Sequence, residues 1–266
     1  MYRRFIYSFF IVFLCNILLY SARSHAQSSS QTLLEGMALL DDGSNKRDYD
    51  QILEARALFE KVTKVDSLSI WAHYYAATAS SAVANMIDEG LIENGRRDLA
   101  DHINTGIKHL EAAVKIDPSF ADGWVLLATS YAHKISVRPF KIIGLRRKYN
   151  RSISLALELE PNNPRVILLQ GIMDYFLPGI AGGNKERAEE RINQAIAIFE
   201  EENITHPYRP KWGHDTAYAR LGVIYMDRGD LVKARKALVR SLELNPEFGW
   251  VLQELLPNLE ELESQT

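Results

Sequence analysis

Apolar residues recur at helical spacing along most of the chain, and the pattern is clearest between residues 215 and 246. In the first part of this stretch, large apolar residues fall on one side of a helix with about 3.6 residues per turn. In the second part, Ala234 and Leu238 form a matching face. Between the two, Gly229 suits the left-handed residue that ends a helix, and Asp230 can cap the helix that follows. The pattern predicts two short antiparallel helices, the second ended by a proline.

A single helical hairpin of this size cannot bury its apolar face alone, so neighbouring hairpins must stack on it. Small residues on the two helices allow a close approach, and large residues fill the space around them. The positions that carry this arrangement are Tyr218, Leu221, Gly222, Tyr225, Ala234, Leu238 and Pro246. At these offsets the stretch resembles the tetratricopeptide repeat (TPR), a helical hairpin of about 34 residues. Leu238 replaces the usual phenylalanine, and Ser241 stands where alanine is common.

The resemblance implies an all-α fold, an α-solenoid of stacked antiparallel helical hairpins that winds into a TPR-like superhelix. Weaker copies of the pattern cover most of the remaining chain. The predicted hairpins span residues 32–66, 70–118, 121–161, 164–202 and 215–246, and a capping helix spans residues 247–262. Residues 206–213 are expected to form a rigid connector ahead of the strongest repeat. Residues 27–266 are therefore predicted to be a single TPR-like domain.

Residues 1–26 follow a different pattern from the rest of the chain. Arginines precede an apolar run from Phe5 to Tyr20, and Ser24-His25-Ala26 places small residues where a signal peptidase reads them. The pattern predicts a secretory signal peptide with cleavage after Ala26. An uncleaved membrane anchor is the alternative, although the apolar run is short for a membrane-spanning helix. We therefore expect a bacterial protein that is secreted across the inner membrane and is periplasmic or envelope-associated.

Removal of the signal peptide changes the charge balance. The full chain has 31 basic and 34 acidic residues and a net charge of −3, and three of its arginines lie in residues 1–26. The mature chain is therefore expected to carry a net charge of −6. The single cysteine also lies in the signal segment, so stability must come from helix packing rather than from disulfide bonds. An exported acidic protein is a poor match for nucleic acid, which argues against that class of partner.

The sequence contains no motif typical of catalysis, metal binding or cofactor binding. Its seven histidines form no His-x-x-x-His pair, and a zinc site needs about four converging ligands. The mature chain has no cysteine nucleophile, and no serine lies in a nucleophile motif. Gly182-Gly183 precedes a predicted helix but lacks the lysine and the serine or threonine of a phosphate-binding loop. We therefore expect a protein that is not an enzyme and that holds no metal or cofactor.

In TPR proteins the first helix of each hairpin lines an inner groove, and the resemblance implies such a groove here. Its expected lining is apolar and aromatic: Trp71, Tyr74, Val125, Leu168, Ile172, Tyr175 and Met226, with Thr129, Ala219 and Val223 between them. An exposed apolar groove is typical of a binding site. The alternative is that the superhelix is tight and these residues fill its core. A clamp for a peptide carboxylate is not expected, because the Lys, Arg and Asn residues that build one are missing from these positions.

A second candidate surface is the basic stretch from Lys134 to Arg151, which contains no acidic residue. Its basic patch comprises Arg138, Lys141, Arg146, Arg147, Lys148 and Arg151. Phe140, Ile142 and Ile143 add apolar side chains. Basic and apolar residues together can dock on an anionic membrane surface or on an acidic partner. The alternative is an ordinary solvated helix whose charges pair with nearby acids.

Taken together, these features predict a non-catalytic protein–protein interaction scaffold in the bacterial periplasm or cell envelope. It would bind an unknown protein or peptide of the envelope through the apolar groove, and the basic patch would contact an anionic membrane surface. The alternative is a periplasmic component that binds a hydrophobic small molecule for a transporter. A closed pocket around Tyr74, Leu168 and Tyr175 would favour that alternative, and an open groove would favour protein binding.

Overall fold

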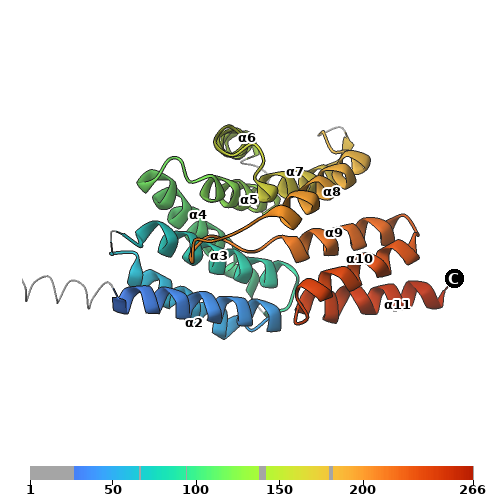
Figure 1. Ribbon diagram of the computed structural model, residues 1–266, viewed down its shortest axis with the longest axis horizontal. Coiled ribbons are helices and arrows are strands. Elements are labelled where there is room, and N and C mark those ends of the chain that lie inside the picture. The colour runs from blue at the N-terminus through green and yellow to red at the C-terminus, as the bar shows by residue number, and fades with distance from the viewer. Residues whose placement is uncertain (1–26, 66, 94, 138–141, 180–181, 266) are drawn as a thin grey trace, which may run out of the picture.

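The computed structural model describes residues 27–65, 67–93, 95–137, 142–179 and 182–265 of the chain. These residues form α-helices without β-strands, and the helices stack side by side in a solenoid (Figure 1), which confirms the predicted fold class. The predicted signal peptide lies outside the described residues, as do Arg138 and Lys141 of the basic patch. Within the described ranges, no helix has the length and apolar character needed to cross a lipid bilayer.

Consecutive helices pack as antiparallel pairs. A helix over residues 27–46 precedes α2 (Tyr49–Val62). The pairs that follow are α3 (Ser69–Asp88) with α4 (Leu99–Ile116), α5 (Ala121–Val137) with α6 (Ile142–Leu159), α7 (Pro164–Phe176) with α8 (Lys185–Glu201), and α9 (His214–Asp227) with α10 (Leu231–Leu244). A 3₁₀ turn, η1 (Gly95–Arg97), precedes α4, and a π-helical turn, η4 (Val251–Leu255), leads into α11 (Leu256–Ser264). We call the side lined by the first helix of each pair the inner face.

Polar residues begin several of these helices in the way that the sequence predicts. Asp230 accepts a hydrogen bond from the backbone nitrogen of Lys233 at the start of α10, and Gly229 before it has a φ of 75°. Asn163 caps α7 by accepting from the backbone nitrogen of Arg165. Such side-chain acceptors satisfy backbone N–H groups that have no partner inside the helix. The predicted turn between α9 and α10 is therefore confirmed.

Close contact between paired helices depends on glycine at two positions. A Cβ atom added to Gly222 on α9 would lie 2.4 Å from the Cδ2 atom of Leu238 on α10. A Cβ atom added to Gly171 on α7 would lie 2.8 Å from the Cγ1 atom of Ile192 on α8. Real Cβ contacts are longer than this, so only glycine lets these helices pack at the observed distance.

The two ends of the solenoid touch each other. Arg47, between the first two helices, contacts Glu89 at the end of α3 and Glu254 in η4. The Asn245 side chain donates to the Asn45 side chain at 3.0 Å. The contacts with Glu254 and Asn245 join residues about 200 positions apart, and they hold the N-terminal helices beside the C-terminal ones (Figure 1). The N-terminal and C-terminal helices therefore lie next to each other at the two ends of the inner face.

Candidate functional site

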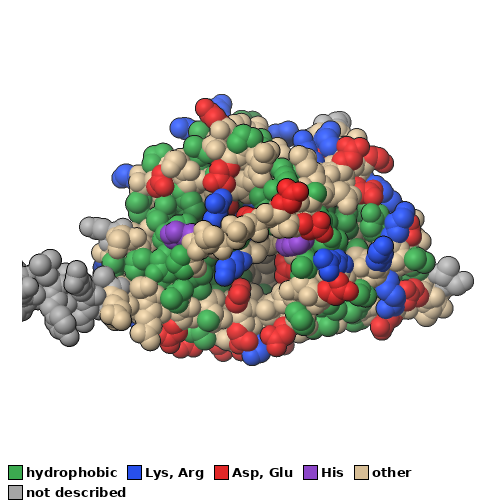
Figure 2. All heavy atoms as spheres, in the orientation of Figure 1, with side chains coloured by type: hydrophobic (Ala, Val, Ile, Leu, Met, Phe, Trp, Pro, Cys, Tyr) green, Lys and Arg blue, Asp and Glu red, His purple; other side chains and the backbone are tan. Residues whose placement is uncertain are grey.

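The inner face is crossed by the connector, which we define as residues 202–213, between α8 and α9 (Figure 1). The Tyr75 hydroxyl donates to the carbonyl oxygen of Tyr208 at 2.9 Å. The Trp212 indole nitrogen donates to the Tyr74 hydroxyl at 2.7 Å. In the space-filling view the connector forms a ridge across this face (Figure 2). The chain's own connector, which turns at residues 206–209 and runs back to α9, therefore lies on the inner face.

Aromatic rings pack directly beneath the connector. The ring of Trp71 stacks on that of His206, with 4.9 Å between the centroids, and meets Phe120 edge-on at 5.2 Å. The hydroxyl groups of Ser30 and Tyr208 lie 2.5 Å apart, so the first helix of the chain also contacts the connector. These contacts join residues that are far apart in the sequence. Through the aromatic side chains of α3, the hydrophobic core therefore reaches the connector.

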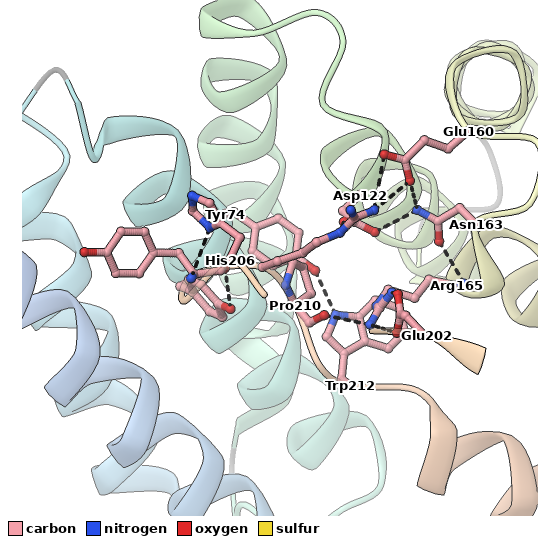
Figure 3. Close-up of polar contacts among 12 residues, drawn as sticks. Tyr74, Asp122, Glu160, Asn163, Arg165, Glu202, His206, Pro210 and Trp212 are labelled. Carbon is pink, nitrogen blue, oxygen red and sulfur yellow. Dashed lines mark hydrogen bonds and ion pairs between the residues drawn. The ribbon is translucent and has the colours of Figure 1, made fainter. Parts of the chain in front are cut away.

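A buried arginine fixes the connector to α7 (Figure 3). The side chain of Arg165 is fully buried, and its Nη atoms donate to both carboxylate oxygens of Glu202 at 2.7 and 3.0 Å and to the carbonyl oxygen of Pro210 at 2.6 Å. Its guanidinium also lies over the ring of Trp212, 5.7 Å from the centroid. Burial by itself lowers the pKa of Arg165, but Glu202 and Asp122 outweigh burial and raise that pKa above its ordinary value. The charge of Arg165 is therefore well compensated.

A second polar group ties the connector to α5. Asp122 is buried and accepts a hydrogen bond from the Asn163 side chain at 3.0 Å. Arg209 of the connector forms an ion pair with Glu160 at 3.0 Å and lies 3.9 Å from Asp122 (Figure 3). Burial raises the pKa of Asp122, and the charge of Arg165 opposes that rise. We call the region under the connector the filled part of the inner face.

The filled part corrects a prediction made from the sequence. Tyr74, Val125 and Leu168 were expected to line an exposed groove, but at most 1% of each side chain is exposed. The physical reason is that the stacked helices enclose these side chains and the connector closes over Tyr74. Trp71 remains half-buried under His206. The alternative interpretation, in which such residues fill a tight core, describes this region.

Beyond the connector, the inner face stays uncovered over α7, α9 and η4, and we call this region the open part. The predicted groove residues Ile172, Tyr175 and Met226 are partly exposed here, and Phe176 is 60% exposed. A hollow of about 180 Å³, which opens to solvent, is lined by Ile172, Tyr175, Phe176, Ile192, Arg220, Val223 and Ile224. The structure therefore brings three of the predicted groove residues together around one largely apolar hollow, namely Ile172, Tyr175 and Val223.

Arg220 is the charged residue of this hollow. Its guanidinium carbon lies 4.4 Å from the ring centroid of Trp250 and 5.6 Å from that of Phe176. Its Nε atom is buried without a hydrogen-bond partner. Burial lowers the pKa of Arg220 to about 10, although the charge of Glu89 opposes this shift. Glu89 itself forms an ion pair with Arg47. Arg220 therefore remains a cation at neutral pH without an ion-pair partner among the described residues.

The sequence analysis did not identify Arg220, Phe176 or Trp250. Arg220 follows Ala219, which was placed in the groove, and precedes Leu221, which was placed against the next helix. The sequence analysis considered only the pattern of apolar residues. It therefore did not consider a charged side chain that lies between a groove position and a packing position. Phe176 ends α7, and the position of Trp250 depends on η4, whose π-helical turn the sequence did not predict.

The basic patch lies on α6, on the outside of the solenoid. Its described members are all exposed: Arg146, Arg147, Lys148 and Arg151. Lys148 forms an ion pair with Glu111 at 3.2 Å, so this charge is partly compensated. Ile143, Arg147 and Arg151 follow one another at intervals of four residues and share a helix face. The side chain of Ile143 is 81% exposed. The structure therefore places an apolar residue and two cations on one exposed face.

Histidines gather on α3 and α4, away from the connector. The Nδ1 atoms of His73 and His109 lie 2.8 Å apart, and Glu60 is 3.7 Å from His109. Burial lowers the pKa of both histidines, so the neutral forms are favoured. In the part of the chain that the structure describes, no group of three or more His, Cys, Asp or Glu residues is arranged to hold a metal ion.

Comparisons with known proteins agree with this geometry. The family model of the tetratricopeptide repeat matches residues 216–248, which confirms the predicted resemblance for the strongest hairpin. No curated protein matches the chain. The chain is similar in structure to the HusA haemophore from Porphyromonas gingivalis, with 21% identity, a TM-score of 0.60, and coverage of 74% of this chain and 93% of HusA. It is also similar to TTC0263, a thermophilic TPR protein in Thermus thermophilus, with 18% identity, a TM-score of 0.58, and coverage of 88% of this chain and 98% of TTC0263.

At these identities the two structures show the fold alone. The chain thus contains one stretch that matches the tetratricopeptide repeat, within a helical solenoid fold. Solenoids of this kind generally act by presenting an extended inner surface to other proteins and are typically not catalytic. In this molecule the connector covers one part of that surface and leaves the other part uncovered.

Proposed function

We propose that this protein is a non-catalytic scaffold that binds a segment of another protein on the open part of its inner face. The observation that carries the proposal is the exposed aromatic surface around the hollow, where Phe176 is 60% exposed beside the partly exposed Tyr175 and Trp250. Aromatic side chains in such a position are typical anchors of protein interfaces. Burial of this surface would provide most of the affinity, at about 25 cal/mol per Å² before ordering costs.

The filled part supports this proposal because it shows how the same face holds a peptide. The connector is held by a backbone carbonyl at Tyr208, by aromatic stacking at His206 and by an ion pair at Arg209, all within one turn of the chain. A partner segment can use the same kinds of contact on the open part, which offers aromatic rings and a cation. The neighbouring helices that line the two parts are equivalent members of successive pairs.

We further propose that the protein acts in the periplasm or cell envelope of a bacterium. The support is the sequence of residues 1–26, which has the charged start, apolar run and small residues of a signal peptide. The partner would then be an envelope protein or one of its exposed segments. Fractionation of cells expressing the protein tests the location. Recovery in the periplasmic fraction is expected, and recovery with the cytosol would contradict the proposal.

A hydrophobic small molecule is a weaker candidate ligand. One structural neighbour is named a haemophore, but the hollow here has about 180 Å³ including space open to solvent, and no histidine is among its lining residues. A shallow hollow of this kind offers a contact surface and cannot enclose a tetrapyrrole. The side chains of Tyr74 and Leu168, which a closed pocket would need, are packed in the core.

Site-specific photo-crosslinking in cells tests the scaffold function. A photoreactive amino acid at position 176 should give one discrete product with a partner protein. The same amino acid at Val232, which is 83% exposed on α10 outside the hollow, is the matched control. The captured partner, once purified, should bind the wild-type protein at least tenfold more tightly than the Phe176→Ala variant, since Phe→Ala at an interface anchor costs more than about 1.4 kcal/mol. Equal crosslinking at both positions, or unchanged binding by Phe176→Ala, would contradict the proposal.

The exposed face of α6 supports a second role, contact with an anionic membrane surface. Ile143 is 81% exposed beside Arg147 and Arg151, a combination that favours the interface of an anionic bilayer. The Arg147→Glu/Arg151→Glu double variant should lose cosedimentation with vesicles containing phosphatidylglycerol. The Lys61→Glu/Lys64→Glu double variant, which reverses two exposed charges on and just after α2, should retain it. Equal loss in the two variants would indicate a net-charge effect and would contradict a specific surface.

A further inference from the structure

Arg220 differs from the other arginine that points to the inner face. Arg165 donates three hydrogen bonds to Glu202 and Pro210. Within the described residues, Arg220 donates no hydrogen bond and forms no ion pair, and its Nε atom is buried. Removing a cation from water without a counter-charge is costly. The structure therefore holds a cation in a place where stability alone does not require one.

The surroundings of Arg220 define what can reach it. The rings of Trp250 and Phe176 lie against the guanidinium, at 4.4 and 5.6 Å from its carbon. The remaining lining of the hollow is aliphatic or aromatic, and it opens to solvent. Two nearby polar groups are already engaged: Glu89 pairs with Arg47, and the Tyr175 hydroxyl donates to Asp227. An incoming anion would therefore meet an orientated guanidinium with free donors at the edge of an apolar hollow.

We propose that Arg220 is the specificity-determining residue of the open part and binds the carboxylate of a Glu or Asp side chain in the partner segment, while an adjacent apolar side chain of that segment packs against the exposed ring of Phe176 at the mouth of the hollow. This inference rests on the proposed scaffold function. A carboxylate is the group that matches a single planar guanidinium, because the two can form two parallel hydrogen bonds. The ring contacts preorganise the guanidinium and exclude water from its faces, which strengthens the interaction with a carboxylate.

The electrostatics agree with this assignment. Burial lowers the pKa of Arg220 to about 10, so the unoccupied site disfavours the cation without neutralising it at physiological pH. A carboxylate bound at the guanidinium would relieve this cost. The same change would leave Arg165 unaffected, because Glu202 already compensates its charge.

A pair of small probes tests the subsite without knowledge of the partner. We would use 4-phenylbutyrate, which joins a carboxylate to an aromatic ring, and 4-phenylbutanamide, its neutral counterpart. Titrations would follow the NMR signals of the Trp250 indole N–H and the Arg220 Nε–H in the whole protein. The carboxylate should bind about tenfold more tightly than the amide, as expected for one charge-assisted hydrogen-bonded pair.

Variants then assign the preference to Arg220. The Arg220→Gln variant should bind the two probes with affinities within twofold of each other, as judged by the Trp250 signal. The Arg235→Gln variant is the control, because Arg235 pairs with Glu263 between α10 and α11, outside the hollow, and it should keep the tenfold preference. Urea unfolding of each variant confirms that the fold is intact.

Each result decides between two statements. Equal binding of the two probes by the wild-type protein, saturable binding of neither, or a preference that persists in Arg220→Gln would overturn the carboxylate subsite. A partner captured at position 176 whose binding is unchanged by Arg220→Gln would also overturn the subsite but leave the scaffold function standing. If the probes behave as expected while no partner is captured at position 176, the subsite stands and the scaffold function fails.

Discussion

The inner face contains the same kind of surface in two states. In the filled part, the connector supplies acceptors and aromatic rings, and Arg165 is fully buried with three hydrogen bonds. In the open part, Arg220 contacts two rings and has no hydrogen bond or ion pair among the described residues, and Phe176 is 60% exposed. The Nε atom is buried without a hydrogen-bond partner in both arginines, so the difference between them lies in their Nη atoms. The two regions belong to one stack of helices, so the difference comes from the presence or absence of the connector.

This comparison separates two regions of one solenoid surface. Where the chain covers its own inner face, the Nη atoms of the buried arginine are hydrogen-bonded and the surface behaves as core. Where it does not, a cation without an ion-pair partner among the described residues lies beside partly exposed aromatic side chains. A buried charge contributes to stability only when its partners are present, and removal of those partners is strongly destabilising. We therefore expect the same substitution to destabilise the protein strongly at Arg165 and little at Arg220.

The largest effect is expected for Arg165→Met. This change leaves the Glu202 carboxylate and the Pro210 carbonyl without their buried donor, and breaking a buried pair costs about 3–5 kcal/mol. Urea unfolding measures the loss. The Arg235→Met variant is the control, because its partner Glu263 is about one third exposed and surface pairs contribute about 0–1 kcal/mol. A loss below about 1 kcal/mol for Arg165→Met would show that the connector is not fixed by this contact.

The next largest effect is expected for Gly222→Leu, which tests the packing behind the open part. A Cβ atom at this position would lie 2.4 Å from the Cδ2 atom of Leu238, which is fully buried. Overpacking of this kind costs about 1–3 kcal/mol, or roughly 2–4 °C in Tm per kcal/mol for a chain of this size. Gly144→Leu is the matched control, because a Cβ atom at exposed Gly144 has open space around it. An unchanged Tm for Gly222→Leu would contradict the repeat register.

A smaller effect on stability, which depends on pH, is expected from the neighbouring histidines of α3 and α4. Burial lowers the pKa of His73 and His109, which lie on α3 and α4 away from the connector. The folded state then binds fewer protons than the unfolded state, so the free energy of unfolding should fall as the pH drops below about 6.5, the ordinary pKa of histidine. The raised pKa of Asp122 acts in the opposite direction, so a variant is needed to isolate the histidines.

The measurement is urea unfolding of the wild type and of His73→Gln at pH 7.5 and 5.5. The wild type should lose more stability between these two pH values than His73→Gln, because the variant lacks one of the two neighbouring histidines. Equal changes in the two proteins, or a larger loss in His73→Gln, would show that the pair does not contribute to the acid response.

Local features of the fold were predictable from the sequence, whereas contacts between distant segments were not. The helical spacing, Gly229 and Asp230 predicted the turn and capping of the strongest hairpin, because those features depend on neighbouring residues. Residues 206–213 were expected to be a rigid connector, but the sequence did not indicate that they would cover the inner face. The bond from Trp212 to Tyr74 spans 138 positions, and no local pattern reports it.

The candidate site was predictable in part for the same reason. The helical offsets put Ile172 and Tyr175 on the inner face, and both residues line the hollow, because these offsets depend only on the period of α7. Those offsets could not distinguish an exposed inner position from one enclosed by neighbours, which is why Tyr74 and Leu168 were misassigned. Arg220 was overlooked because its significance comes from the missing partner, and that is a property of the three-dimensional structure.

The most direct test of the account is the effect of Arg220→Met on stability, compared with that of Arg165→Met. Replacement of an uncompensated cation by an apolar side chain of similar length should leave the free energy of unfolding within about 1 kcal/mol of the wild type, with any loss of ring contacts offset by the lower burial cost. Urea unfolding of the two variants side by side should therefore show a gap of at least about 2 kcal/mol, with Arg165→Met the less stable protein. Equal destabilisation by the two substitutions would contradict the central claim, because it would show that Arg220 is as well compensated inside the protein as Arg165.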